Sequence, residues 1–191
     1  MGLEFGLSIE TIRGALATFG GVKRRLEVVG SARGVTVMND YGHHPTEIRA
    51  TLRAVRECFA DSIRRLVVVF QPHRYTRTQM CWSEYLTAFG EADDLILSEV
   101  YAASEEPIVG VSSEALLSEI QHPSKELCSS FDDLPATLAS RLQEGDFVVC
   151  LGAGSVGALP EKLLHRLDST ALLDAGSNLE APLLKVVVGG K

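Results

Sequence analysis

Leu66-Val67-Val68-Val69-Phe70 decides the fold, because every residue of this stretch is apolar. A strand of this composition is buried on both faces, as in a parallel sheet that helices cover from either side. An amphipathic helix is expected before it, over residues 45–59, with Pro45 in its first turn. Strands and helices alternate along the chain, which predicts an α/β, three-layer Rossmann-like domain with a mostly parallel sheet and helices on both faces. The expected strands are 26–29, 35–38, 66–70, 94–98, 126–128 and 147–151, and the expected helices are 8–19, 45–59, 79–89, 112–120, 134–142 and 160–167.

The pattern divides the chain into three parts. Residues 1–24 contain a short helix that Ser8 caps and Gly20-Gly21 stops, followed by a linker. Residues 25–168 carry the regular alternation and form the main domain. Residues 169–191 lose it, and we interpret them as a linker or the start of a further element.

Composition restricts the class of protein. A chain of 191 residues with 46% hydrophobic residues is long and apolar enough to build a core. A net charge of -7 argues against a nucleic-acid partner, which requires a positive surface. No window approaches the roughly 20 apolar residues of a membrane span, and the N-terminus lacks a secretory signal, so we expect a cytoplasmic protein with no membrane partner. The four cysteines are expected to be buried free thiols: Cys58, Cys81, Cys128 and Cys150.

Chemically versatile side chains gather in the segments that follow the expected strands. In an open parallel sheet, ligands bind beyond the carboxyl ends of the strands. We therefore expect the functional site in four loops, at residues 39–44, 71–77, 99–105 and 152–155.

The first loop places Asp40, Tyr41, His43 and His44 directly before the helix that begins at Pro45. The free N–H groups of a helix start favour an anion. Adjacent histidines do not easily point the same way, so one is expected in the site while the other packs or caps. A purely structural pair is the alternative, and the strand-end position beside Asp40 favours function.

The second loop carries His73, Arg74 and Arg77, whose guanidinium groups suit a carboxylate or a phosphate. A solvated basic turn is the alternative interpretation. The third loop is acidic, with Tyr101 among its glutamates. The fourth, at residues 152–155, has the sequence GAGS, which suits phosphate binding and close helix–strand packing equally well.

Two further groups of side chains are candidates for the core or for a metal site. Trp82 and Tyr85 have helical spacing and are expected in the core or at its rim. The histidines of the loops do not form an HExxH pair or a similar fixed spacing, so we expect no dedicated zinc site. A magnesium ion brought in with a nucleotide requires only a carboxylate or two and stays open.

Four segments resemble the UDP-N-acetylmuramate–L-alanine ligases of the Mur ligase family. Residues 39–48, NDYGHHPTEI, are similar to that family's DDYGHHPTE signature, and residues 70–78 are FQPHRYTRT, as in the family motif. Residues 99–108, EVYAASEEPI, resemble DVYAAGExPI, and residues 20–27, GGVKRRLE, match the passage from the central to the C-terminal domain.

The resemblance implies the C-terminal domain of a three-domain enzyme of peptidoglycan synthesis. Such a ligase couples ATP hydrolysis to amide formation between UDP-N-acetylmuramate and L-alanine, through an acyl phosphate. Residues 1–24 would then be the tail of the central ATP-binding domain and its linker. ATP and Mg²⁺ would be held mainly by the other two domains, which are implied partners of this chain.

The same resemblance implies roles for individual residues. L-alanine and its carboxylate would be bound or oriented by His43, Arg74 and Arg77, in a crevice lined by His73 and Tyr41, while Arg25 and Asp40 would contact ATP. Independently of the family, a small zwitterion must be held mainly by its charges, which suits paired arginines. A neutral His43 is a candidate to accept the proton of the attacking amine.

The chain departs from the family pattern at three positions, with Asn39 and Glu99 in place of aspartate and Ser104 in place of glycine. The changes at positions 39 and 99 argue against a metal or ribose role for these two side chains. The sequence also contains no GxxxxGK[ST] segment. We therefore expect no ligase activity from this chain alone, and alanine-dependent ATP hydrolysis by the purified chain would refute that expectation.

Three alternatives remain. A related recycling ligase joins a tripeptide to the same sugar nucleotide, but its first motif usually departs from YGHH, so Tyr41-Gly42 favours the alanine enzyme. A stand-alone nucleotide-binding module would bind ATP tightly without other domains. A metal-dependent hydrolase would use the histidines with Asp40 and carry stoichiometric metal.

Overall fold

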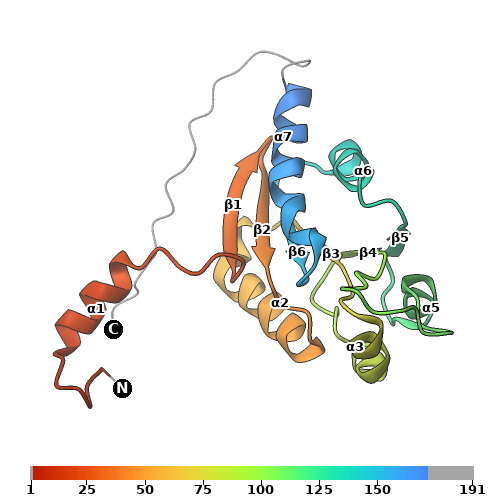
Figure 1. Cartoon of the computed structure of the whole chain (residues 1–191). Coiled ribbons are helices and arrows are strands. Elements are labelled where there is room, and N and C mark those ends of the chain that lie inside the picture. The colour runs from red at the N-terminus through yellow and green to blue at the C-terminus, as the bar shows by residue number, and fades with distance from the viewer. Residues whose placement is uncertain (1, 172–191) are drawn as a thin grey trace.

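The computed structural model describes residues 2–171 of the chain, and the expectations for residues 172–191 lie outside this part. Its α-helices and strands alternate as expected (Figure 1). In chain order they are α1 (Ile9–Thr18), β1 (Glu27–Ala32), β2 (Val35–Asp40), α2 (Pro45–Phe59), β3 (Arg65–Phe70), α3 (Tyr75–Met80), α4 (Trp82–Tyr85), β4 (Asp94–Ser98), α5 (Ser113–Glu119), β5 (Lys125–Cys128), α6 (Leu134–Arg141), β6 (Asp146–Leu151) and α7 (Leu159–Ala171). Two short 3₁₀ helices, η1 (Ala60–Ser62) and η2 (Ser155–Ala158), complete them.

The six-stranded sheet has the order β1-β2-β6-β3-β4-β5. Strands β2, β6, β3, β4 and β5 run parallel, and β1 joins the edge as an antiparallel partner of β2. The predicted mostly parallel sheet is therefore confirmed. Because β2 and β3 both pair with β6, the loops that follow all three strands meet at one edge of the sheet.

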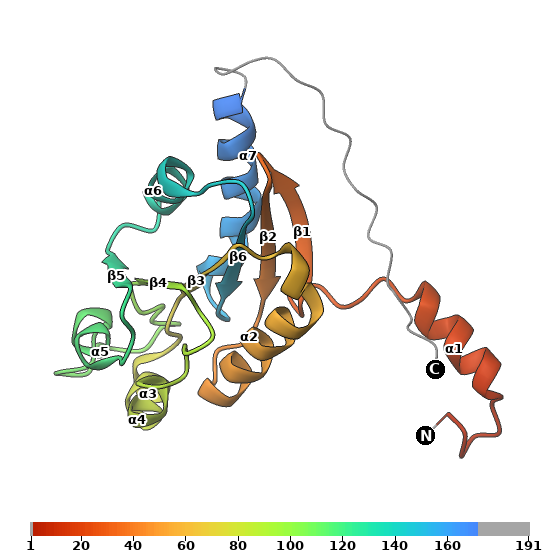
Figure 2. The same ribbon diagram turned by 180° about the vertical axis from the view of Figure 1, so that it is seen from behind.

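Helices cover both faces of the sheet (Figures 1 and 2). Alternate residues of β3 enter two separate cores, as the two-residue period of a strand requires. Leu66, Val68 and Phe70 pack with α2, α4 and α5, whereas Val67 and Val69 pack with α6 and α7. The central strand is buried on both sides, as its apolar sequence predicted.

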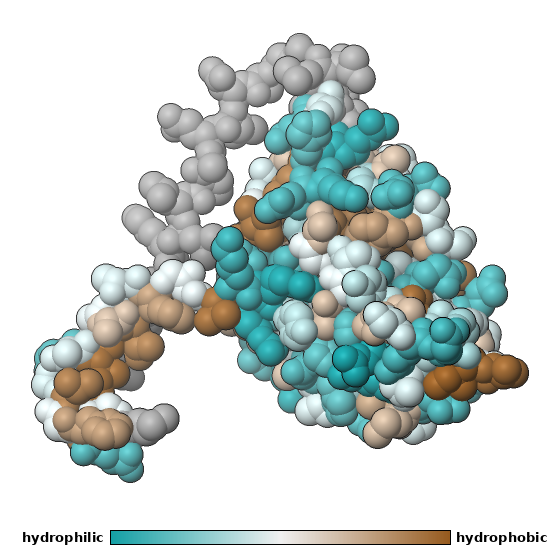
Figure 3. Space-filling view, viewed as in Figure 1, coloured by the Kyte–Doolittle hydropathy of each residue, from teal (hydrophilic) through white to brown (hydrophobic). Residues whose placement is uncertain are grey.

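Helix α1 lies apart from the sheet and has no buried residue. The expected cap is present, because the Ser8 hydroxyl accepts a hydrogen bond from the Thr11 N–H at 3.1 Å. Figure 3 shows apolar side chains on its surface, and Ile9, Leu16 and Phe19 are all exposed. Within the part of the chain that the structure describes, no helix is long and apolar enough to cross a membrane.

Some predictions of local structure were wrong. The strand expected over residues 26–29 runs from Glu27 to Ala32 as β1. The helix expected over residues 79–89 is replaced by α3 and α4, because Arg74 turns the chain with φ 71° and α3 begins at once after it. The helix predicted at 160–167 also runs on to Ala171 as α7. Cys81 and Cys150 are buried and Cys128 is half-buried, but Cys58 is exposed in the last turn of α2, at the edge of the helix's buried face.

Candidate functional site

The first predicted loop connects β2 to α2 and is anchored by Asp40. This residue is only 3% exposed. Its Oδ2 accepts a hydrogen bond from the Leu26 N–H at 2.8 Å, and its Oδ1 accepts one from the Gly42 N–H at 2.7 Å. The Thr51 hydroxyl of α2 adds a longer bond to Oδ1 at 3.3 Å. Asp40 therefore ties the linker and the histidine loop to the sheet, and its expected contact with ATP stays a prediction.

The two adjacent histidines have different positions, as expected. His44 is the N-cap of α2, and its Nδ1 accepts a hydrogen bond from the Thr46 N–H at 3.3 Å. The Glu47 carboxylate accepts from the backbone N–H groups of His43 and His44, at 3.1 and 3.2 Å. Burial raises the pKa of Glu47, but these hydrogen bonds and the nearby charge of Arg25 lower it, so the pKa lies below its usual value.

His43 is the member of the pair that faces the second loop. Its Nδ1 lies 3.0 Å from the Tyr41 carbonyl oxygen, and its side chain is 17% exposed. The buried Tyr85 of α4 donates a hydrogen bond from its hydroxyl to the His43 carbonyl oxygen at 2.6 Å. Burial raises the pKa of this tyrosine, so the hydroxyl keeps its proton and remains a donor.

The second loop brings His73 and Arg77 together because α3 begins at Tyr75, only two residues after His73. Arg77 lies in α3, four residues after His73. Its Nη1 is 3.0 Å from His73 Nδ1 and donates a longer bond to the His73 carbonyl oxygen at 3.4 Å. Burial, followed by the positive charges of Arg77 and Arg74, lowers the pKa of His73. Arg74 is exposed beside them at the start of α3.

The third loop packs directly against the second. The Tyr101 ring is stacked on His73, with 5.5 Å between centroids and 16° between planes. The Arg74 N–H donates to the Tyr101 carbonyl oxygen at 2.8 Å, and the Tyr101 N–H donates to the Pro72 carbonyl oxygen at 2.8 Å. Glu105 accepts from the Thr76 N–H and hydroxyl at 3.0 and 2.7 Å, and these two hydrogen bonds lower its pKa.

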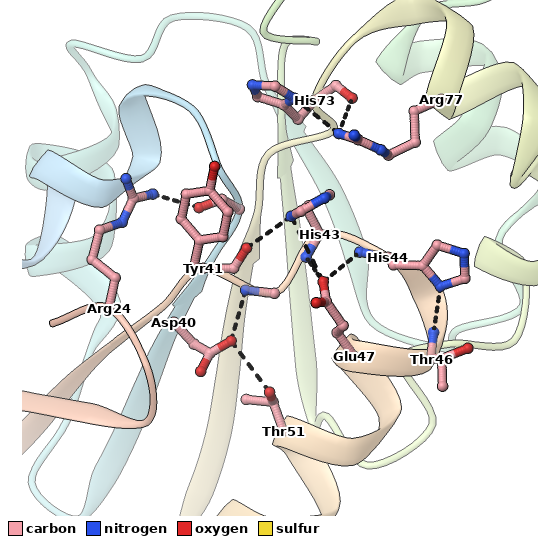
Figure 4. Close-up of polar contacts among 12 residues, drawn as sticks. Arg24, Asp40, Tyr41, His43, His44, Thr46, Glu47, Thr51, His73 and Arg77 are labelled. Carbon is pink, nitrogen blue, oxygen red and sulfur yellow. Dashed lines mark hydrogen bonds and ion pairs between the residues drawn. The ribbon is translucent and has the colours of Figure 1, made fainter. Parts of the chain in front are cut away.

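These contacts place Tyr41, His43, His73 and Tyr101 in one run of rings, the ring cluster. The centroid distances along it are 5.4, 6.0 and 5.5 Å. In Figure 4 the His43 ring lies between Tyr41 and the His73–Arg77 pair. Of the seven predicted site residues, the cluster contains Tyr41, His43 and His73, while Arg77 contacts His73 and Arg74 is adjacent. The remaining two, Arg25 and Asp40, lie on the linker side of Tyr41.

A family model described as Mur ligase, glutamate ligase domain, matches residues 24–154, the region that holds nearly all of this site. The chain belongs to the Mur ligase family.

Similar relatives carry the name of one Mur ligase. The UDP-N-acetylmuramate–L-alanine ligase of Myxococcus xanthus is 46% identical over 172 residues, which are 88% of this chain and 36% of that protein. The ligase of the same name from Sorangium cellulosum is 44% identical over 92% of this chain and 38% of its own length. The Mur ligase chain described here thus spans little more than a third of these relatives.

Solved structures support the fold. The UDP-N-acetylmuramate–alanine ligase of Thermotoga maritima has a TM-score of 0.68 and 23% identity, covering 88% of this chain and 35% of that one. A murein peptide ligase from Psychrobacter arcticus has a TM-score of 0.62 and 26% identity, covering 86% of this chain and 34% of its own. The Rossmann-like α/β architecture is therefore that of the Mur ligases.

Sequence reasoning missed Arg24 of this Mur ligase domain. Its Nη2 donates to the Gly152 carbonyl oxygen at 2.5 Å, and its guanidinium lies 4.9 Å from the Tyr41 ring centroid. Its backbone carbonyl accepts from the Tyr41 N–H at 2.7 Å. Arg24 therefore connects the linker to both the first and the fourth loop. The signals in the sequence are its place beside Arg25, the residue predicted to contact ATP, and its position in the GGVKRRLE segment.

The glycines of the fourth loop serve close packing. A Cβ on Gly154 would lie 2.5 Å from the Gln71 side-chain oxygen and 2.6 Å from the Tyr101 ring. Gly152 has φ 144° and approaches the Gln71 backbone. Gln71 also accepts from the Val156 N–H at 2.9 Å and exchanges hydrogen bonds with Ser155. Of the two roles open for this loop, the geometry supports packing and leaves phosphate binding untested.

The three departures from the family pattern have different surroundings. The Asn39 amide donates to the Gly157 carbonyl oxygen at 3.1 Å, which a carboxylate cannot do. Ser104 has φ 69°, a left-handed conformation that glycine adopts without strain. Burial and the neighbouring Glu114 raise the pKa of Glu99. Among residues 2–171, no group of three or more histidine, cysteine or acidic side chains is placed to hold a metal ion.

Proposed function

We propose that this chain is the amino-acid-binding domain of the ATP-dependent ligase that joins L-alanine to UDP-N-acetylmuramate. The observation that carries the proposal is the approach of His43 to the His73–Arg77 pair, with Arg74 adjacent, beyond the carboxyl ends of β2 and β3. Ligands of parallel α/β sheets bind at this edge. Two imidazoles and two guanidinium groups suit a small zwitterion that offers a carboxylate and an amine.

The ligand roles follow the charges. Arg74 is exposed and supplies the positive charge for the carboxylate of L-alanine. Arg77 and His73 hold the same end of the molecule, whereas His43 faces the amino group and Tyr41 lines the site. Arg25 is exposed on the other side of Tyr41, with its guanidinium 5.6 Å from the ring centroid, and is proposed with Asp40 on the nucleotide side.

The proposed reaction requires one proton acceptor. The amine nitrogen attacks the carbonyl carbon of the acyl phosphate, a C–N bond forms, the C–O bond to phosphate breaks, and inorganic phosphate leaves with its electron pair. The proton lost from nitrogen passes to the His43 imidazole. If His43→Ala raised only the KM for L-alanine and left kcat unchanged, this role would be wrong.

ATP, Mg²⁺ and UDP-N-acetylmuramate are proposed as ligands of the whole enzyme. Magnesium prefers carboxylate oxygens and water. The described residues do not fit this ion, because Asp40 is occupied by internal hydrogen bonds and no group of three or more histidine, cysteine or acidic side chains among residues 2–171 is placed to hold a metal. We therefore place the metal with the remaining domains and derive no step from it.

The proposal is tested by mixing this chain with the separately purified amino-terminal and central domains of a UDP-N-acetylmuramate–L-alanine ligase. Phosphate release that requires all the polypeptides, UDP-N-acetylmuramate and L-alanine supports it. Loss of that activity with Arg74→Ala, but not with Arg53→Ala on the exposed face of α2, assigns it to the site. No turnover in the mixture, with an active full-length control, counts against the proposal.

A second candidate is the ligase that joins a tripeptide to the same sugar nucleotide. Its motivation is the structural similarity to the murein peptide ligase of Psychrobacter arcticus, at 26% identity. The same mixture distinguishes the two functions, because activity with the tripeptide L-alanyl-γ-D-glutamyl-diaminopimelate in place of L-alanine would favour the recycling enzyme.

A further inference from the structure

The surroundings of His43 determine which of its ring nitrogens carries a proton. Nδ1 lies 3.0 Å from the Tyr41 carbonyl oxygen and 3.6 Å from Glu47 Oε2. A carbonyl and a carboxylate oxygen only accept hydrogen bonds, so Nδ1 must be the donor. The neutral His43 ring then carries its proton on Nδ1, and its Nε2 has a free lone pair.

The surroundings of His73 determine the opposite arrangement. Its Nδ1 lies 3.0 Å from Nη1 of Arg77, and a guanidinium group only donates. The second bond from Arg77, to the His73 carbonyl oxygen at 3.4 Å, holds the guanidinium in place. Nδ1 of His73 is therefore the acceptor, and the neutral ring carries its proton on Nε2. Burial and the nearby positive charges lower the pKa of His73, which favours this neutral form near pH 7.

Both Nε2 atoms remain available to a ligand. Within residues 2–171, the hydrogen bonds of the two rings involve only their Nδ1 atoms. Neither Nε2 is among the buried polar atoms without a partner, so neither is sealed in the interior. The ring centroids are 6.0 Å apart, so one small molecule can contact both rings. Figure 4 shows the two rings side by side.

We infer that the site presents two neutral imidazoles in opposite tautomers, with His43 Nε2 accepting a hydrogen bond from the amino group of a small amino acid and His73 Nε2–H donating one to its carboxylate. The inference deepens the proposed function and rests on it for the identity of the ligand. It adds a positioning role for Arg77, which acts on His73 by occupying Nδ1, while Arg74 supplies the exposed charge for the carboxylate.

The arrangement has a chemical consequence. A neutral donor holds the carboxylate without adding a positive charge beside His43, so His43 can still accept a proton from the amine. Because each ring already uses its Nδ1, the ligand must offer a hydrogen-bond donor to His43 and an acceptor to His73. Ethylamine lacks the carboxylate and N-acetylalanine lacks the basic amine, so each satisfies only one of the two rings.

The tautomers are measured directly on the purified chain, without any activity assay. Long-range ¹H–¹⁵N spectra of ¹⁵N-histidine-labelled protein separate bare from protonated ring nitrogens, at about pH 8 where histidine is ordinarily neutral. We expect a protonated Nδ1 and bare Nε2 for His43, and the reverse for His73, with signals assigned by His43→Gln and His73→Gln. A bare Nδ1 on His43 or a protonated Nδ1 on His73 overturns the inference.

Arg77→Leu tests the positioning role. Removal of the donor should release His73 into a mixture of tautomers and shift its Nδ1 signal toward the protonated position, while the His43 signals stay in place. Arg74→Leu is the matched control, because it removes a neighbouring positive charge but no bond to Nδ1, and should leave the tautomer unchanged. An unchanged His73 spectrum in Arg77→Leu contradicts the inference, with amide spectra confirming the fold of each variant.

The inference and the proposed function fail in different experiments. If the tautomers differ from those expected but the chain still supports alanine-dependent turnover, the inference is wrong and the proposed function is supported. Expected tautomers in a chain that supports no turnover with either L-alanine or the tripeptide would remove the proposed function and leave the two imidazoles as a geometric fact.

Discussion

The hydroxyl of Tyr85 donates a hydrogen bond to the backbone carbonyl oxygen of His43 over 2.6 Å. Tyr85 belongs to α4 and is fully buried, so the core of the domain reaches directly to the loop that carries the site histidines. The same ring packs at 5.4 Å from Phe70, the last residue of β3. Tyr85 thus connects the end of β3 to the backbone of His43 in the loop after β2.

Tyr85→Phe should destabilise the domain by about 1–3 kcal/mol, because it leaves the His43 carbonyl oxygen without its partner. Urea denaturation measures the free energy of unfolding. Tyr75→Phe is the control, since the described part of the chain shows no hydrogen bond of the Tyr75 hydroxyl. Equal stability of wild type and Tyr85→Phe would show that this bond contributes nothing to the loop.

Asp40→Asn should destabilise the domain more than Thr51→Val does. The amide nitrogen of asparagine cannot accept, so the Leu26 or the Gly42 N–H loses its partner at a cost of about 1–3 kcal/mol. Thr51→Val removes only the longer bond to the same carboxylate. Hydrogen exchange should accelerate at the amide of Leu26 or of Gly42 in the first variant alone, and unchanged exchange at both would refute the anchoring role of Asp40.

The Asp146 carboxylate should make stability fall in acid. Burial raises its pKa, but hydrogen bonds from Arg65 and the Gln143 N–H, and the charges of Arg65 and Arg64, outweigh it, so the folded-state pKa lies below 3.8. A depressed folded pKa contributes stability above the unfolded pKa and loses it as pH falls through the folded one. Urea midpoints between about pH 6 and pH 3 should drop more for wild type than for Asp146→Asn. Parallel curves would exclude this carboxylate as a cause.

Ser104→Gly should stabilise the domain. Ser104 has φ 69°, and a left-handed conformation costs a non-glycine residue about 1–2 kcal/mol. The larger backbone entropy of glycine in the unfolded chain offsets about 0.5–1 kcal/mol of that gain, so a net increase of about 0.5–1 kcal/mol is expected. Ser118→Gly, in the exposed part of α5, should lose stability instead. A loss in both variants would contradict the strain at Ser104.

The sequence predicted the elements that depend on local pattern. Strands β3, β4 and β6 lie within one residue of their predicted positions, because each is a short continuous apolar run. Ser8 and Pro45 marked the starts of α1 and α2. By contrast, the positive φ of Arg74 has no signature in a side-chain pattern, and it moved Arg77 from a loop into a helix.

The loops that form the site could be predicted from the sequence, whereas the contacts between their residues could not. The rule that ligands bind beyond strand ends is enough to select the loops of Tyr41, His43, His73 and Arg77 from the sequence. Tyr101 stacks on His73 from 28 positions further along the chain. The hydrogen bond from Tyr85 to His43 spans 42 positions. No spacing in one sequence encodes such contacts.

The most direct test of the central claim is a chimera in which this chain replaces the matching third of the Myxococcus xanthus ligase, to which it is 46% identical. Phosphate release would be measured with ATP, Mg²⁺, UDP-N-acetylmuramate and L-alanine. We predict L-alanine-dependent release that Arg74→Ala abolishes and Arg53→Ala leaves intact. A folded chimera that releases no phosphate with L-alanine, or whose activity survives Arg74→Ala unchanged, would contradict the assignment of this domain as the amino-acid site.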